Sequence, residues 1–376
     1  MAHIYTSQMP EFRVDGQSQP AFQANLLTLE CRETLNHPAD LQVNFQNWGV
    51  QDGQIGFQFF NPDLLGFGRQ VQVKIGTESI FSGKIYAVQG SYPLNTPPRI
   101  GVAAGDALAN LQGERRTRTF TNVTLADLAH SIAAENSMSS KTSSLPNIHF
   151  EKMYQHNQTD LEFLLRLTRQ FGFFVHVEDQ KLVARGSLVD EDPVQLALGS
   201  DLLSAQVSAD LRSQYTAVHI TGWDPSQKDI IDGEADEELQ QNSLNGMASG
   251  SSLYAAVFGP RPDYRFEAGL QDQSQGTSQA QAAFQQQAQR FVQVQGQTAG
   301  TPELRPGRSV DLNGLGEWFD GVYRVESVTH RFDLSQGFRT EFQASRPYIS
   351  GYSPPDATLQ AAASARKRAR SKKPAF

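Results

Sequence analysis

The chain has 376 residues, which is too many for one ordinary hydrophobic core, since domains typically hold about 100 to 200 residues. We therefore expect two to four domains. Apolar residues make up 39% and charged residues 19% of the chain, a composition that is typical neither of a disordered protein nor of a membrane protein. The net charge is −8 although six positive charges lie between Arg366 and Lys373, so the rest of the chain is strongly acidic, which argues against sequence-specific nucleic-acid binding.

Cysteine usage and the N-terminus indicate where the protein is made. Cys31 is the only cysteine, which excludes an intrachain disulfide and a thiolate zinc site, and fits a reducing compartment. The stretch Met1–Glu11 has no apolar run of signal-peptide length, and no stretch approaches about 18 uninterrupted apolar residues. We expect synthesis in the cytoplasm without a signal peptide, and no membrane segment.

Residues 1–105 are predicted to form a first β domain. Apolar residues alternate along several short stretches, namely Phe22–Leu26–Thr28, Leu41–Val43–Phe45 and Val71–Val73–Ile75. The polar turn Gly76–Ser79 joins Gln70–Ile75 to Ile80–Val88 and predicts a hairpin.

Residues 106–195 are predicted to form an α/β segment. Thr124 precedes apolar residues at helical spacing and is a candidate N-cap, with Asp127 three residues later. Thr159 and Glu162 form a capping box for a second helix, which Gly172 is expected to end in a left-handed conformation. Alternation after Gly172 predicts a β-hairpin.

Residues 196–350 are predicted to form a second β domain. Within it, residues 226–262 lose periodicity and carry an acidic, Ser/Gly-rich sequence that indicates an exposed insertion. A Gln-rich helix is expected over Ser278–Gln293, and the block Arg305–Pro347 is again β-rich. Residues 351–376 are predicted to be a disordered basic tail.

Two segments about 240 residues apart resemble each other. Gly68-Arg69 begins a strand that is followed by a turn and by Gly83 in a Phe-x-Gly sequence, and Gly307-Arg308 begins a similar frame that ends at Gly321. Each frame describes a strand, a tight turn and a strand whose glycine marks a bend, a bulge or a close backbone approach. A duplication would give two related small β-barrels, although chance similarity of short frames is an open alternative.

The sequence offers no catalytic constellation. It contains no phosphate-binding loop, no H-E-x-x-H zinc helix and no G-x-S-x-G nucleophile elbow. The histidines at 156, 176, 219 and 330 lack a second histidine at ligand spacing, so structural roles are favoured, and we expect no catalytic, cofactor-binding or metal site. Trp223 and Asp224 stand at the end of an apolar strand, where Trp223 is predicted to be a packing anchor, with burial at an interface as the alternative, and Asp224 a turn residue.

Three stretches carry a family resemblance. Tyr154–Leu164 with Phe171–Phe173 resembles a "Q-x-N-x-T/S-D-L-x-F-L … G-F" helix, and Val218–Pro225 resembles a "V-x-V-x-G-W-D-P" strand end. Pro306–Arg308 together with Tyr323–Val325 and His330 resembles a final barrel signature. In this order the stretches resemble the late control protein D family of tailed phages, which is related to the N-terminal hub portion of VgrG spike proteins.

The resemblance implies an α+β, β-dominated fold with two related tube-protein-like β-barrels and an inserted α/β segment. It implies a homotrimer in the baseplate of a phage tail or phage-like injection particle, non-enzymatic, which adapts a threefold central spike to a sixfold inner tube. The expected partners are a separate spike protein, the inner tube protein and other baseplate proteins, and an acidic lumen is a further expectation. The structural candidates are Gly68, Arg69, Gly83, Gly172, Trp223, Asp224, Gly307, Arg308 and Gly321.

Two alternatives to the hub are open at this point. The chain could be a type VI-like spike adaptor that carries secreted effectors, with the basic tail as a docking peptide. A tail-associated cell-wall hydrolase is the other alternative, although the carboxylate pair Glu237–Glu238 lies in a predicted loop without aromatic sugar platforms.

Overall fold

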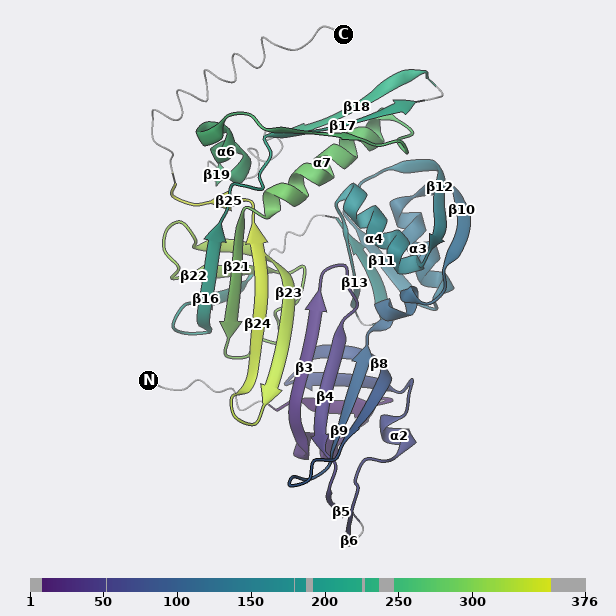
Figure 1. Cartoon of the computed structure of the whole chain (residues 1–376), viewed down its shortest axis with the longest axis vertical. Helices are drawn as coiled ribbons and strands as arrows, with labels where there is room; N and C mark the ends of the chain where they lie inside the picture. Colours follow the sequence, from purple (N-terminus) through teal and green to yellow (C-terminus); the bar gives the residue numbers. More distant parts are fainter. Residues whose placement is uncertain are drawn as a thin grey trace.

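The computed structural model describes residues 9–51, 53–178, 180–186, 192–224, 227–236 and 247–352 (Figure 1). The fold is α+β and dominated by strands, which confirms the predicted fold class. One 13-stranded sheet runs through the molecule, with β3 and β23 adjacent at its centre. We call the part before residue 106 the first β unit, and the strands of this sheet after residue 192 the second β unit.

The first β unit contributes seven strands to the large sheet. They are β1 (Glu11–Val14), β2 (Gln17–Ser18), β3 (Leu26–Thr34), β4 (Asp40–Gln46), β7 (Gln70–Ile75), β8 (Glu78–Ser91) and β9 (Arg99–Gly105). The predicted hairpin is confirmed as β7 and β8. The same unit has the short helices α1 (Pro20–Ala24) and α2 (Pro62–Leu65) and the small hairpin β5 (Gly49–Gln51) and β6 (Gln54–Gly56).

One strand prediction in this unit is wrong. Phe22 was expected in an alternating strand with Leu26, but it lies in α1. Pro20 occupies the first turn of this helix, where its fixed φ favours helical geometry and its missing N–H costs nothing. Phe22 then packs into the core on the rings of Phe45 and Phe59, with centroids 4.8 and 5.3 Å away.

The second β unit contributes six strands. They are β15 (Val194–Ala197), β16 (Leu202–Ala209), β21 (Val292–Thr298), β22 (Ser309–Asn313), β23 (Gly321–Asp333) and β24 (Gly337–Arg346). Most of their apolar side chains form a second core, whereas Phe332 of β23 and Phe338 of β24 pack into the core of the first unit. The β-rich block predicted over Arg305–Pro347 is therefore confirmed.

An α/β segment follows the first β unit. Its elements are η1 (Ala107–Gln112), β10 (Arg116–Thr124), α3 (Leu125–Glu135), β11 (Ser139–Ser143), β12 (His149–Gln158), α4 (Asp160–Phe171), β13 (Phe174–Glu178) and β14 (Lys181–Arg185). Both capping predictions are confirmed. The hydroxyl oxygens of Thr124 and Thr159 each accept the N–H of the third helical residue, and the backbone N–H of each threonine donates to the carboxylate of that residue. Gly172 ends α4 with φ of +70°, as predicted.

A second excursion leaves the sheet between β16 and β21. It holds β17 (Ala217–Asp224), β18 (Asp229–Asp236), β19 (Ala248–Ser249), α6 (Gly250–Phe258), β20 (Pro262–Phe266) and α7 (Gln273–Gln289), and β19 pairs with β25 (Tyr348–Ile349) near the end of the described chain. The Gln-rich helix is confirmed as α7, which begins five residues earlier than predicted. The expected loss of periodicity over residues 226–262 is wrong for the described part, because β18 alternates between buried and exposed residues. Glu237 and Glu238 lie outside the described residues, as does the predicted tail from residue 353.

Candidate assembly surface

The two β units repeat the same strand arrangement. The order β3-β4-β9-β8-β7 in the first unit matches β16-β21-β24-β23-β22 in the second. The bulge between Leu26 and Thr28 has its counterpart between Leu202 and Ser204. A second bulge, between Ile85 and Ala87, recurs between Val325 and Ser327. Irregularities at matching places in matching strands indicate duplication, because bulges are specific features rather than defects.

The repeated glycines occupy equivalent places. The N–H of Gly68 donates to the carbonyl of Ile85 at 2.8 Å, and the N–H of Gly307 donates to the carbonyl of Val325 at 2.8 Å. Both glycines have positive φ, +82° and +88°, which disfavours any residue with a side chain. The frames that begin at Gly68 and Gly307 are therefore equivalent in three dimensions.

The second glycines of the two frames are not equivalent, so that part of the sequence alignment is wrong. Gly83 lies opposite Val71, whereas Gly321 lies opposite Leu312, two residues further along its strand. Gly83 allows a close approach, since a Cβ there would lie 2.2 Å from the carbonyl oxygen of Gly105. Gly321 instead has φ of +125°.

The two arginines of the repeat have different partners. Arg69 forms ion pairs with Asp15 at 2.7 Å and with Asp63 at 2.5 Å, and thereby ties the β1–β2 turn to α2. Arg308 donates to the backbone carbonyl of Glu303 at 3.4 Å. The equivalence of the two frames therefore rests on the glycines at their starts.

Trp223 does not anchor the core. Its side chain is 51% exposed on the outer face of β17, so the prediction of a packing anchor is wrong and the alternative, an interface role, stays a prediction. Trp223 faces outward because Gly222, its neighbour in the strand, takes the inward position beside Leu270. Asp224 accepts the N–H of Gln227 at 3.1 Å, in agreement with a turn residue.

The units meet at an inner junction, formed by antiparallel pairing of β3 with β23 from Thr28–Asp333 to Thr34–Ser327. Residues on the inward sides of these strands are buried there: Val328 is fully buried and Phe332 is 7% exposed. On the polar side, Arg331 forms ion pairs with Glu30 at 2.6 Å and with Glu341 at 3.3 Å.

A buried ion pair locks the inner junction. Arg305 donates through Nε and Nη2 to the two carboxylate oxygens of Glu33, each at 2.6 Å, and through Nη1 to the carbonyl oxygen of Ser79 at 2.5 Å. Glu33 is only 6% exposed, and this burial raises its pKa, while the positive charge of Arg305 lowers it again. Sequence reasoning missed this pair, since the partners are 272 residues apart; the only signal was the position of Arg305 directly before the Pro306-Gly307-Arg308 motif.

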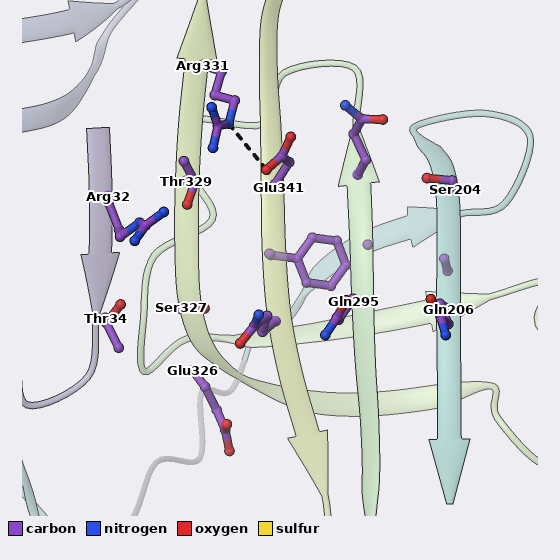
Figure 2. A pocket seen from close by; sticks show the side chains of 15 residues that line it. Arg32, Thr34, Ser204, Gln206, Gln295, Glu326, Ser327, Thr329, Arg331 and Glu341 are labelled. Atoms are coloured by element: carbon purple, nitrogen blue, oxygen red, sulfur yellow. Dashed lines mark hydrogen bonds and ion pairs between the residues drawn. The ribbon is translucent and has the colours of Figure 1, made fainter. Parts of the chain in front are cut away.

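A polar groove of about 790 Å³ crosses the junction on the outward face of the sheet (Figure 2). Five strands, β3, β23, β24, β21 and β16, contribute its lining, which is rich in amide and hydroxyl side chains. Arg32 and Arg331 are balanced in this lining by Glu326 and Glu341. The groove is therefore close to neutral rather than acidic.

Each β unit also has an open strand edge at a place that the inner junction fills in the other unit. Of the described strands, only β9 pairs with β8 beyond Ile85, and only β21 pairs with β16. These edges are the counterparts of the two strands that form the inner junction, since β8 corresponds to β23 and β16 to β3. The exposed Val88 (37%) and Tyr92 (61%) correspond to Val328 and Phe332, which the inner junction buries.

The comparisons with known proteins bear on this duplicated architecture. A family model described as the Alg8 N-terminal domain matches residues 14–333, which is most of the chain. The chain belongs to the Alg8 N-terminal domain family. A search of curated proteins found no significant match. As for membranes, no helix in the described part of the chain is long and apolar enough to cross one.

Several solved structures share the fold of this Alg8 N-terminal domain member. The 43 kDa tail protein of prophage MuSo2 from Shewanella oneidensis is 15% identical with a TM-score of 0.68, over 91% of this chain and 99% of that chain. A tail protein from Neisseria meningitidis MC58 is 12% identical with a TM-score of 0.68, over 91% and 97%. An E. coli protein described as a component of the type VI secretion system is 15% identical with a TM-score of 0.59, over 92% and 79%. At these identities the likeness concerns the fold, and it confirms the predicted resemblance to phage tail and VgrG-related proteins at that level.

Proposed function

We propose that the chain is a structural baseplate hub of a contractile phage tail or phage-like injection system. In this proposal three copies form a ring that joins a threefold central spike to a sixfold inner tube. The role requires no catalytic chemistry.

The observation that carries the proposal is the pair of open edges. Two strands that are equivalent to the partners of the inner junction each have one side without a strand partner among the described residues: β8 beyond Ile85 in the first unit, and β16 in the second. An edge strand pairs readily with another chain, because its N–H and C=O groups lack partners. Pairing β8 of one copy with β16 of the next is a head-to-tail contact, which closes into a ring when the rotation allows.

The ring would repeat one type of junction throughout. With two β units in each chain, three chains present six similar modules, whereas the two excursions from the sheet occur once per chain and keep the symmetry threefold. Such a ring can therefore meet a sixfold partner and a threefold partner. The near-neutral groove of β3, β23, β24, β21 and β16 would line the passage and bind phosphate groups weakly, since phosphate affinity comes from unpaired Lys and Arg.

The inner junction predicts the register of the contact between copies. Arg331 lies opposite Glu30 in the inner junction. Ser91 of β8 is equivalent to Arg331 of β23, because each lies six residues past the equivalent bulge residues Ile85 and Val325. In the same way, Gln206 of β16 is equivalent to Glu30 of β3, because each lies four residues past the equivalent bulge residues Leu202 and Leu26. We therefore expect Ser91 to lie opposite Gln206 of the next copy.

Paired cysteine substitutions test this register. The Ser91→Cys/Gln206→Cys variant should form intermolecular disulfides, because opposite Cα atoms in a sheet are about 4.5–5.5 Å apart, within disulfide range. On non-reducing gels the product should end at three 41.5 kDa chains, and native mass spectrometry of the unsubstituted protein should give the same trimer. The Ser91→Cys/Ser204→Cys variant is two residues out of register and serves as the control. A monomer at every concentration, or equal cross-linking of the two variants, would contradict the proposal.

A separate measurement addresses the non-enzymatic role. We expect no clearing in a peptidoglycan zymogram with the purified chain. Clearing that survives repurification would favour the cell-wall hydrolase instead.

A further inference from the structure

The sheet β18-β17-β20 has one covered face and one uncovered face. Helix α7 covers the inner face, where Ile220, Ile231 and Phe284 are buried in a common core (Figure 1). On the outer face three strands contribute large apolar side chains to solvent: Trp223 is 51% exposed, Ile230 65%, Tyr264 72% and Phe266 71%. Scattered single apolar residues are normal on a surface, but a group of this size on one sheet face indicates a contact.

The same outer face carries a row of acids. Along β18, Asp232, Glu234 and Asp236 alternate with buried residues, so their side chains share one face at a repeat of about 6.6–6.8 Å. Asp232 lies opposite Thr221 and Glu234 opposite His219. Within this row Glu234 lies 3.8 Å from the ring of His219, and Asp236 also has an interaction partner. The face is thus aromatic on the β17 and β20 side and acidic on the β18 side.

The chain itself contains a segment of complementary pattern. Alternate residues are basic at four consecutive positions, Arg366, Arg368, Arg370 and Lys372. In an extended conformation alternate side chains point to the same side, with the same repeat as the acids of β18. Lys367 and Lys373 would point to the opposite side.

We propose that residues 366–372 bind in an extended conformation across the outer face of the β18-β17-β20 sheet of the same molecule. The alternate cations face the carboxylates of β18, and their guanidinium groups can also stack on Trp223 or Tyr264, since arginine is attracted to aromatic faces. Residues 353–365 connect the last described residue to this segment, and 13 extended residues reach at most about 45 Å.

The segment lies on the face of the sheet because the neighbouring edge is blocked. The side chain of Gln273 accepts the backbone N–H of Asp232 at 3.1 Å and donates to its carbonyl oxygen at 2.6 Å. These contacts occupy the backbone groups that an added strand would need at that position. Side-chain contacts across the face do not compete with them.

This intramolecular binding goes beyond the hub role, and either can fail without the other. A bound basic segment covers the exposed aromatic residues and neutralises an acidic surface, so a partner that needs this face must displace it. Because the contacts are largely ionic, salt weakens them: the screening length falls to about 3 Å at 1 M ionic strength.

Fluorescence of the full-length protein tests the proposal with a matched pair of variants. The Trp48→Phe/Trp318→Phe background leaves Trp223 as the sole tryptophan, since the chain has three. In low salt we expect blue-shifted Trp223 emission that moves to the red in 1 M salt. Arg366→Ser/Arg370→Ser should give the red-shifted emission already in low salt, whereas Lys367→Ser/Lys373→Ser, with the same loss of charge, should behave like the background.

Zero-length carbodiimide cross-linking identifies the contact. In dilute protein we expect a bond between the amine of Lys372 and a carboxylate of Asp232, Glu234 or Asp236 within one molecule. Its yield should fall about threefold to tenfold in Arg366→Ser/Arg370→Ser and stay within about 1.5-fold in Lys367→Ser/Lys373→Ser. Equal effects of the two variants, cross-links only between copies, or no cross-link to β18 would each overturn the proposal. None of these outcomes depends on whether the chain forms a trimer. Native mass spectrometry tests the trimer by itself, so failure of this proposal can be told apart from failure of the hub proposal.

Discussion

The buried pair Glu33–Arg305 gives the sharpest test of how the two β units are held together. Replacing Arg305 with Met removes three hydrogen bonds and leaves the carboxylate of Glu33, 6% exposed, without its counter-ion. Breaking one partner of a buried ion pair typically costs about 3–5 kcal/mol, because the remaining charge stays desolvated. Since the Arg305 side chain is 34% exposed, we expect the lower end, about 3 kcal/mol, for Arg305→Met.

The loss should be local to the inner junction. Hydrogen–deuterium exchange of the β3 and β23 amides should accelerate about 100-fold in Arg305→Met, which corresponds to about 3 kcal/mol at about 1.4 kcal/mol for each factor of ten. The double variant Glu33→Met/Arg305→Met should recover most of the protection, since replacing a whole buried pair with apolar side chains is often neutral. The exposed pair Arg32–Glu30, at 3.7 Å, supplies the control: Arg32→Met should change protection by less than about 0.5 kcal/mol. A cost below about 1 kcal/mol for Arg305→Met, or no recovery in the double variant, would refute the reasoning.

Three further predictions concern single positions. Gly83→Ala should destabilise the first β unit by about 3 kcal/mol in urea unfolding, since the new Cβ would lie 2.2 Å from the carbonyl oxygen of Gly105, whereas Gly56→Ala, which meets nothing within 4 Å, should change little. Thr159→Ala should cost about 1 kcal/mol through loss of the N-cap bond to the Glu162 N–H at 3.1 Å, and an unchanged midpoint would contradict the cap's contribution. Burial lowers the pKa of His330 to about 3, below its ordinary value of about 6.5. The stabilising contribution of the neutral His330 is therefore complete above pH 6.5 and is lost as the pH falls toward 3. At pH 5 the loss in the free energy of unfolding is about 2 kcal/mol. His330→Gln should therefore show a smaller loss of stability between pH 6.5 and 5 than the unsubstituted chain, and equal losses would exclude His330 as the cause.

Local signals in the sequence predicted local structure well. The capping boxes at Thr124 and Thr159, the stop at Gly172 and the hairpin that begins at Gln70 are all decided by residues within a few positions of one another. Such interactions can be read from a single sequence, because their partners are neighbours in the chain. The same holds for the starts of the two repeat frames, which need glycine at positive φ.

Features that depend on distant segments were not predictable in this way. The contact between Glu33 and Arg305 depends on β3 meeting β23, and nothing near either residue specifies this pairing. Trp223 shows the same limit: its alternation with buried neighbours was visible, but which face α7 would cover was not. The two-residue offset of Gly83 and Gly321 also requires the register of the strands, because a similar spacing in sequence does not fix which residues lie opposite each other.

The duplicated architecture also explains why the chain, rather than the single β unit, would be the building block of a ring. Glu33 of the inner junction corresponds to Ala209 at the open edge, since each lies seven residues past the equivalent bulge positions Leu26 and Leu202. Arg305 likewise corresponds to Gly66, because each lies two residues before the first glycine of its frame, Gly307 and Gly68 respectively. The junction between copies would therefore lack the buried ion pair and rest on strand pairing and apolar contacts such as those of Val88. A locked inner junction forms within one molecule without any loss of translational freedom, whereas the unlocked outer junction must overcome that loss at each step. We therefore expect folded chains with a complete inner junction to precede the ring, and dilution to open the outer junctions while the inner one persists.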